Sequence, residues 1–230
     1  MIKILLIILI LILITTNSSI NRIIDRFTNQ PSKEPSNVKY IITDEEIYYP
    51  VIDNGIELEY SRFNYKTKEV GHIYAKKIMK QVTSNHPKIL VLGVALGGII
   101  INILDKYPNS KVTGVDITDE YFDLVRKYSD NSRLTLIKED AQEYIANNSG
   151  KIAFDIIICD ISDGLSIPLF TVSKPFLDKI NKMILPNGKF IINTIDNDDN
   201  FIQTSLRAAF NKKPIIRNNL GSNNVYTVNI

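Results

Sequence analysis

The sequence predicts an α/β protein with a doubly wound, mostly parallel sheet, and three observations support this fold class. From residue 88 onward, short runs rich in isoleucine and valine alternate with segments of helical spacing, which is the pattern of helices that cover both faces of a parallel sheet. The first of these runs, "KILVLG", ends in a glycine turn that leads into a helical segment. The tail "PIIRNNLGSNNVYTVNI" holds two strand-like runs joined by a Gly-Ser turn, so one C-terminal strand should be antiparallel. Together these features predict a Rossmann-like sheet.

Residues 1–19 are expected to be a secretory signal peptide. Lys3 precedes an unbroken apolar run from Ile4 to Ile14, and small polar residues follow at once. A membrane span needs about 20 apolar residues and a signal-peptide core about 7–15, so this run fits the second class. Cleavage is expected near Asn17 to Ile20, which would place the protein outside the cell or in the lumen of the secretory pathway. The alternative is an uncleaved anchor that holds the protein at the membrane.

Three further segments are expected after the signal peptide. Residues 20–37 are polar and contain prolines, which indicates a linker. Residues 38–66 should form a small β-rich unit, because Asn54-Gly55 between apolar runs is a strong hairpin signal. Residues 67–230 should form the main domain, which begins with a helix in "GHIYAKKIMKQV". Its expected strands are "KILVLG", "KVTGVD", "LTLIKED", "FDIIICD" and "GKFIINTI", and the helices between them include "DEYFDLVRKYS", "AQEYIANN" and "KPFLDKINKMI".

The composition excludes several classes of function. The net charge is only +2, with no dense block of lysine and arginine, so nucleic acid is not an expected partner. The single cysteine, Cys159, permits neither an intramolecular disulfide nor a cysteine zinc site. With only two histidines, a metal centre is not expected either.

A glycine-rich turn is the expected cofactor loop. Gly93 ends the first strand of the main domain, and Gly97 opens the helix that follows. Glycine at such a turn lets backbone N–H groups approach a ligand, although Ala95 and its neighbour break the ordinary dinucleotide fingerprint. Asp116 ends the next strand, where a carboxylate accepts hydrogen bonds from the hydroxyls of a ribose. Gly93, Ala95, Gly97 and Asp116 are therefore expected to bind a nucleoside-containing cofactor.

Further acids end the third and fourth strands, at the same carboxyl edge of the sheet where α/β proteins bind ligands. Asp140 is expected near an adenine, or else as the N-cap of the next helix. Asp160 could take a proton from an amine nucleophile, or else stabilise a turn. Asp163 is the second candidate catalytic acid, with a simple loop residue as its alternative. Tyr74 is expected to line the acceptor pocket, or else to be a core aromatic.

These parts resemble class I S-adenosylmethionine-dependent methyltransferases, and their order is closest to the spermidine synthase-like branch. That branch has a β-rich N-terminal piece, a helix with a tyrosine, a glycine-rich loop and two acids after the fourth strand. The corresponding stretches here are 38–63, "HIYAKKIM", "GVALGG" and "DISD". The stretch "FTVSKPFLDKINKMILPNGKFIINTI" is also similar to a module of methyltransferases that modify a translation elongation factor. The resemblance implies S-adenosylmethionine as cofactor.

One departure from that branch separates the expected functions. Leu96 stands in the substrate pocket where aminopropyltransferases carry an acid, and a neutral side chain cannot compensate an ammonium group. The first expectation is therefore an S-adenosylmethionine-dependent methyltransferase whose acceptor, a small molecule or a protein amine, is unknown. An aminopropyltransferase that makes a polyamine and a secreted, non-catalytic binding protein are the alternatives. Homodimerisation is left open.

Overall fold

The structure, a computed structural model, describes residues 41–53, 56–83, 87–162, 166–195, 198–211 and 213–230. The predicted signal peptide and linker lie outside the described residues. Within those described ranges, no helix is both long enough and apolar enough to cross a membrane.

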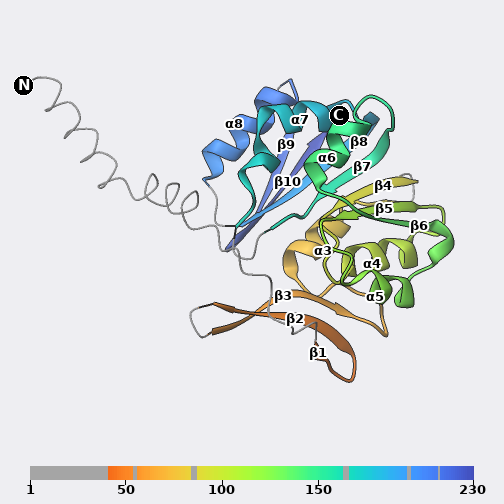
Figure 1. The fold of residues 1–230 in the computed structure, drawn as a ribbon. Helices are drawn as coiled ribbons and strands as arrows, with labels where there is room; N and C mark the ends of the chain where they lie inside the picture. Colours follow the sequence, from red (N-terminus) through yellow and green to blue (C-terminus); the bar gives the residue numbers. More distant parts are fainter. Residues whose placement is uncertain (1–40, 54–55, 84–86, 163–165, 196–197, 212) are drawn as a thin grey trace, which may run out of the picture. The chain divides into compact units, whose positions relative to one another are not determined.

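A seven-stranded sheet forms the centre of the main domain, as the sequence predicted (Figure 1). The order of its strands is β6-β5-β4-β7-β8-β10-β9. All neighbours from β6 to β8 are parallel, and β10 is antiparallel to both β8 and β9, so β10 is the one reversed strand among those described. The strands are β4 (Lys88–Leu92), β5 (Lys111–Asp116), β6 (Leu134–Lys138), β7 (Phe154–Cys159), β8 (Ile184–Ile195), β9 (Ile215–Leu220) and β10 (Asn223–Asn229).

Among the described residues, three helices pack on each face of this sheet. One face packs against α3 (Ile73–Met79), α4 (Gly98–Lys106) and α5 (Phe122–Tyr128). The other face packs against α6 (Ala141–Asn148), α7 (Lys174–Asn181) and α8 (Asp199–Ala209). The central strands β4 and β7 are almost entirely buried, which explains why their sequences are unbroken apolar runs. Two short 3₁₀ helices, η1 (Asn131–Arg133) and η2 (Leu169–Val172), complete the connections.

Strand β8 begins four residues before the predicted start at Gly188. Ile184 pairs with Phe154 and Lys189 with Ile156, so the stretch "LPNG" between them is an irregularity in the pairing. Asn187 has a left-handed φ of 65° there. Proline, asparagine and glycine are typical of turns, so the sequence of this stretch does not indicate a strand. Strand β8 includes it because Ile184, before the stretch, pairs with β7.

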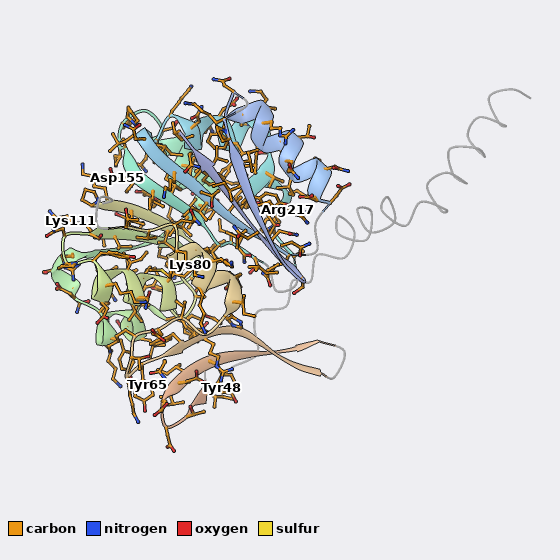
Figure 2. The ribbon with its side chains drawn as sticks, turned by 180° about the vertical axis from the view of Figure 1, so that it is seen from behind. Tyr48, Tyr65, Lys80, Lys111, Asp155 and Arg217 are labelled. Atoms are coloured by element: carbon orange, nitrogen blue, oxygen red, sulfur yellow. The ribbon has the colours of Figure 1, made fainter. Side chains whose placement is uncertain are left out.

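The N-terminal β unit is an antiparallel sheet of β1 (Ile41–Ile42), β2 (Glu46–Asp53) and β3 (Ile56–Asn64). Asp53 pairs with Ile56, which agrees with the predicted hairpin, although Asn54-Gly55 itself lies outside the described residues. Phe63 of β3 is fully buried in the same core cluster as α4. A Cβ atom at Gly98 would lie 3.0 Å from the Cβ of Phe63, so glycine lets β3 approach the start of α4 closely. Tyr48 and Tyr65 mark this sheet and the turn after it in Figure 2.

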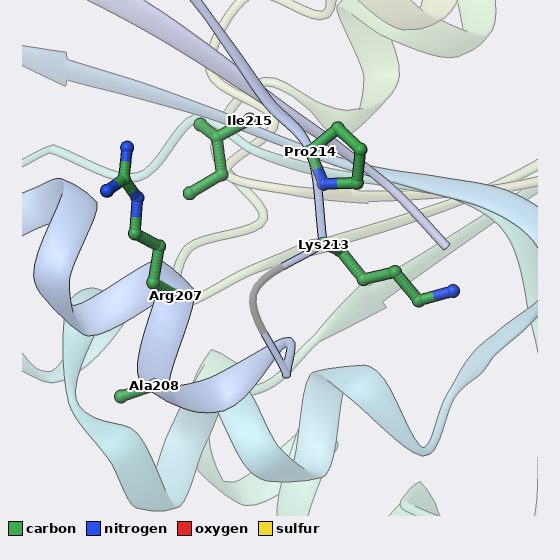
Figure 3. A pocket seen from close by; sticks show the side chains of 5 residues that line it. All are labelled: Arg207, Ala208, Lys213, Pro214 and Ile215. Atoms are coloured by element: carbon green, nitrogen blue, oxygen red, sulfur yellow. The ribbon is translucent and has the colours of Figure 1, made fainter.

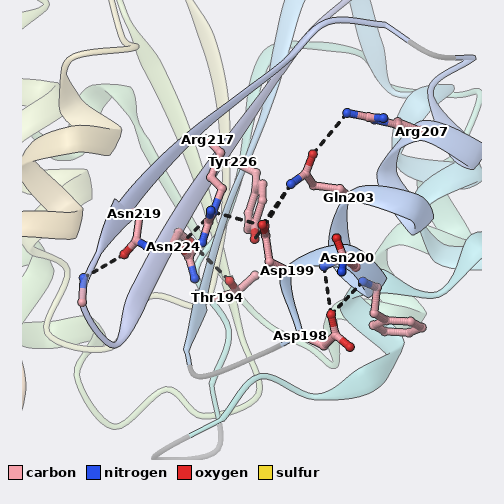
Figure 4. A network of polar contacts seen from close by, with 12 residues as sticks. Thr194, Asp198, Asp199, Asn200, Gln203, Arg207, Arg217, Asn219, Asn224 and Tyr226 are labelled. Carbon is pink, nitrogen blue, oxygen red and sulfur yellow. Dashed lines mark hydrogen bonds and ion pairs between the residues drawn. The ribbon is translucent and has the colours of Figure 1, made fainter.

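A polar network fixes the start of α8 to the C-terminal hairpin (Figure 4). Asp199 accepts a hydrogen bond from the hydroxyl of the fully buried Tyr226, and its Oδ1 lies 3.1 Å from Nε of Arg217. The same Nε donates to Oδ1 of Asn224 at 3.1 Å. Burial and the neighbouring Asp199 carboxylate both raise the pKa of Tyr226, so its phenol stays neutral and donates. Asp198 caps the helix by accepting from the backbone N–H groups of the next turn.

Candidate functional site

The predicted site residues converge because the strand order reverses at β4. Strands β5 and β6 lie on one side of β4, and β7 lies on the other. Leu92, the last residue of β4, pairs with Val115 and with Cys159. Gly93 and the acids at positions 116 and 160, each the next residue on its strand, therefore emerge side by side at the carboxyl edge. Lys111 and Asp155, near the amino ends of their strands, mark the opposite edge in Figure 2.

The glycine loop has a left-handed backbone at three positions, and each is occupied by glycine or alanine. Gly93 has a φ of 86° and its N–H donates to the carbonyl of Val115 at 2.9 Å. A Cβ atom on Gly93 would lie 2.4 Å from the backbone oxygen of Asp160. Ala95 has a φ of 45° and Gly97 a φ of 76°, both in the left-handed region that favours glycine. The loop therefore brings its backbone directly against the end of β7.

Asp116 holds this loop in place. Its Oδ2 accepts from the backbone N–H groups of Val94 at 2.7 Å and Ala95 at 3.2 Å. Its Oδ1 accepts from the backbone N–H of Thr118 at 3.0 Å. A carboxylate has about four lone-pair positions, so these contacts leave about one for a ligand hydroxyl. A second ribose contact requires an amide of the loop to release the carboxylate.

Asp140 and Ile117 are two further residues near this edge of the sheet, and only Asp140 was predicted from the sequence. Asp140 is the N-cap of α6, and its Oδ1 accepts from the backbone N–H of Gln142 at 2.6 Å, so the alternative of a helix cap is what the structure shows. A contact to adenine stays a prediction. Ile117 was missed: it follows Asp116 directly and is 71% exposed, so it offers an apolar surface for a flat ring. Its only signal in the sequence was an apolar residue directly after a strand-ending acid.

Asp160 is a half-buried carboxylate held by two neutral side chains. Its Oδ1 accepts from Nδ2 of Asn193 at 2.9 Å, and Tyr74 of α3 also hydrogen-bonds to it. Loss of surrounding water raises its pKa to about 6, and the hydrogen bonds from Asn193 and Tyr74 limit that rise. Cys159 points to the other face of the sheet, where burial raises its pKa to about 12 and keeps the thiol neutral. Tyr74 also stacks on His72, with 5.6 Å between ring centroids.

Asn193 and Asn223 were missed by sequence reasoning. Asn193 lies on β8, is 4% exposed, and accepts from Nδ2 of Asn223 at 3.0 Å through its own Oδ1. The signal was a single amide within the apolar run "KFIINTI". A buried amide needs partners, and here they are supplied by β7 and β10.

Leu96, another of the predicted residues, is not part of this cluster. Leu96 is fully buried in the core, so a ligand could reach it only if the loop moved. Asp163 lies outside the described residues. No group of three metal-ligating side chains occurs among the residues that the structure describes. A hollow of about 540 Å³ lies elsewhere, at the end of α8 and the start of β9 (Figure 3). Its lining residues are Arg207, Ala208, Lys213, Pro214 and Ile215.

Comparison with known proteins assigns this architecture to a family. The chain is 31% identical over 150 residues to polyamine aminopropyltransferase 2 of Caldanaerobacter subterraneus, in a match that covers 59% of this chain and 50% of that protein. It is 25% identical over 138 residues to the human eEF1A lysine and N-terminal methyltransferase, covering 53% of this chain and 20% of that one. The chain thus spans half or less of the length of these two relatives.

A solved structure shares the fold. The crystal structure of human methyltransferase-like protein 13 in complex with SAH matches with a TM-score of 0.60 at 20% identity, covering 69% of this chain and 82% of that one. The spermine/spermidine synthase domain matches residues 71–213, which is more than half of this chain and includes the glycine loop, Asp116 and Asp160. The chain therefore belongs to the spermine/spermidine synthase domain family.

Proposed function

We propose that this protein is an S-adenosylmethionine-dependent transferase that moves a methyl group to an amine acceptor. The observation that carries the proposal is Asp160, a carboxylate at the reversal point of the sheet whose partners Asn193 and Tyr74 are both neutral. The ion pairs among the described residues leave this carboxylate without a cation. Such a group is suited to pair with an ammonium brought by a ligand.

The proposed cofactor lies across the glycine loop. The backbone of Gly93, Ala95 and Gly97 lets it approach the sheet, and Asp116 binds a ribose hydroxyl while it holds the loop. Ile117, and Asp140 beyond it, are the proposed neighbours of the adenine ring. The family assignment supports this arrangement, as does the fold shared with a methyltransferase whose structure contains SAH.

The chemistry proposed for the residues is proton removal and alignment. When bound, S-adenosylmethionine supplies an electrophilic methyl group on a sulfonium, which needs little covalent help. Asp160 would accept the proton that the acceptor amine loses on methylation. A pKa of about 6 leaves Asp160 mostly ionised at neutral pH and still basic enough to accept that proton. Tyr74 positions the carboxylate and the acceptor. Asp163 remains the second candidate catalytic acid.

Aminopropyl transfer is the second candidate, because of the domain family and the aminopropyltransferase relative. It requires an acid near the loop to hold a second ammonium. Leu96 supplies no charge there and is turned into the core. Methyl transfer does not need that charge, so we rank it first.

A secreted protein that binds ligand without turnover is the third candidate. It rests on the N-terminal apolar run, since export would separate the protein from a cofactor made in the cytosol. We propose that this run directs the chain into the secretory pathway, and sequencing the N-terminus of the protein from a secreting cell tests this.

Calorimetric titration with S-adenosylmethionine, its decarboxylated form and its demethylated product tests the proposal. Methyl transfer predicts binding of S-adenosylmethionine and the product, with the decarboxylated form no tighter. Preference for the decarboxylated form, with spermidine formed from putrescine, would put aminopropyl transfer first. Binding with no methylation of any supplied amine would favour the third candidate, and no binding of any of the three compounds would remove the proposal.

A further inference from the structure

We propose that Asn223, acting through Asn193, is a positioning residue that fixes the orientation of the Asp160 carboxylate. This inference deepens the proposed function and rests on it, because the orientation of the carboxylate affects catalysis only if Asp160 faces an acceptor. Asp160 directly follows β7, Asn193 lies on β8 and Asn223 begins β10, and these three strands are neighbours in the sheet.

The sheet brings these side chains to one face. Val225 pairs with Asn193 across β8 and β10, and Asn223 pairs with Ile195. Because side chains alternate along a strand, Asn193 and Asn223 lie on the same face as Ile191 and Val225, the face covered by α3, α4 and α5. Asp160 follows Ile158 of that same face by two positions. The contacts are 2.9 Å from Asn193 Nδ2 to Asp160 Oδ1 and 3.0 Å from Asn223 Nδ2 to Asn193 Oδ1.

The direction of the chain of hydrogen bonds follows from the chemistry of its members. An ionised carboxylate only accepts, so the Asn193 amide must present its NH₂ group to Asp160. Its oxygen then faces β10 and needs a donor, which Asn223 supplies. With the amide turned over, its oxygen would face the carboxylate, an arrangement that only a protonated Asp160 can satisfy. Asn223 therefore favours the ionised form of Asp160 and the contact of its Oδ1 with the sheet. The lone-pair positions that Asn193 and Tyr74 do not use remain for an acceptor.

The packing of the hairpin alone does not require this arrangement. The backbone ladder between β8 and β10 runs over seven paired residues, from Asn223 to Asn229, and already joins the two strands. A purely structural pair of amides would affect stability and leave the protonation of Asp160 unchanged. The pKa of Asp160 is therefore the readout that separates the two roles. The other titratable side chains described beside it are Tyr74 and Cys159, and the thiol stays neutral because burial raises its pKa to about 12.

The test is a carbon NMR titration of the ligand-free protein labelled at aspartate carboxyl carbons, with the Asp160 signal assigned by its loss in Asp160→Asn. Asn223→Asp replaces the donor by an acceptor, so the Asn193 amide should turn over and the pKa of Asp160 should rise by about one unit or more. Asn193→Leu removes the relay and should itself raise the pKa. In the double variant that combines Asn193→Leu with Asn223→Asp, the second substitution should raise the pKa of Asp160 by less than about 0.3 units further, because an effect relayed through Asn193 cannot occur without it. A through-space charge effect would persist undiminished in the double variant and would overturn the proposal.

Asn223→Ala covers the case in which Asn223→Asp fails to fold. Loss of the donor weakens the polarisation of the Asn193 amide, so the pKa of Asp160 should rise by a few tenths of a unit. An unchanged pKa in every Asn223 variant that folds overturns the proposal. The titration contains no cofactor, so its outcome is separate from that of the proposed function. A shifted pKa in a protein that binds no S-adenosylmethionine would uphold the positioning role and reject the methyltransferase.

Discussion

Replacing Gly93 by alanine tests whether the glycine loop must lie directly against the end of β7. Gly93 combines a left-handed φ of 86° with a Cβ position only 2.4 Å from the backbone oxygen of Asp160. The nearest atom is a backbone oxygen of the residue that directly follows the central strand β7, so it cannot rotate away as a flexible side chain would. The Gly93→Ala variant must therefore move either the loop or the carbonyl of Asp160.

The expected loss of stability has two parts. A left-handed φ costs alanine about 1 kcal/mol relative to glycine. Forcing an extra methyl group into a packed site adds about 1–3 kcal/mol. The sum is about 2–4 kcal/mol, which corresponds to a fall in Tm of roughly 5–15 °C for a domain of this size.

Two other glycines of the protein serve as controls that separate the cost of the steric clash from the cost of the left-handed φ. Gly150 and Gly221 have φ values of 75° and 83°, and a Cβ atom on either would meet nothing within 4 Å. Their alanine variants should therefore lose only about 1 kcal/mol. Thermal unfolding followed by circular dichroism measures all three variants. If Gly93→Ala is no less stable than Gly221→Ala, the close approach of the loop to β7 is wrong.

Substitutions at three other positions test different parts of the molecule. Asp160→Asn should be about 3 kcal/mol more stable than the parent at pH 8 and only slightly more stable at pH 4, because a pKa raised from 3.8 to about 6 makes the parent lose stability as pH rises through that window. Equal differences at both pH values in thermal unfolding would contradict this. Arg133 donates to the carbonyls of Leu104 in the last turn of α4 and of Tyr107 and Ser110 after it, so Arg133→Ala should cost about 2 kcal/mol in urea unfolding and Arg133→Lys should recover only part of it. Full recovery by lysine would show that charge alone matters. Asp116→Ala should weaken S-adenosylmethionine binding by more than about tenfold in calorimetry, because it would remove both the proposed ribose contact and the hydrogen bonds that hold the loop. Unchanged affinity would reject the ribose assignment.

The central strands could be predicted closely because they are buried on both faces. Strands such as "KILVL" and "FDIIIC" are continuous apolar runs because both of their faces are buried. The helices between them can be recognised in the sequence because the spacing of their apolar residues changes to the helical period. The start of β8 was missed for the opposite reason. Its first residues have turn chemistry, and the pairing with β7 overrides it.

The site was predictable in its acids and not in its amides. Asp116 and Asp160 end apolar strands, and the rule that ligands bind at carboxyl ends locates them without any structure. Asn193 belongs to a strand distant in sequence, and its partners Asp160 and Asn223 are 33 and 30 residues away. No local pattern records a contact across three strands. The sequence likewise showed that Leu96 is neutral but not that its side chain points into the core.

The sequence by itself therefore determined the order of strands and helices, the glycine turn and the acids that end the strands, because each depends on periodicity or on neighbours along the chain. The tertiary structure alone decided which atoms these groups touch. Asp116 uses most of its lone pairs on backbone amides, two of the glycine loop and one of Thr118, and Asp160 has its pKa raised by the protein that surrounds it. Both results depend on which groups replace water around a carboxylate, and that is fixed only when distant strands pack side by side.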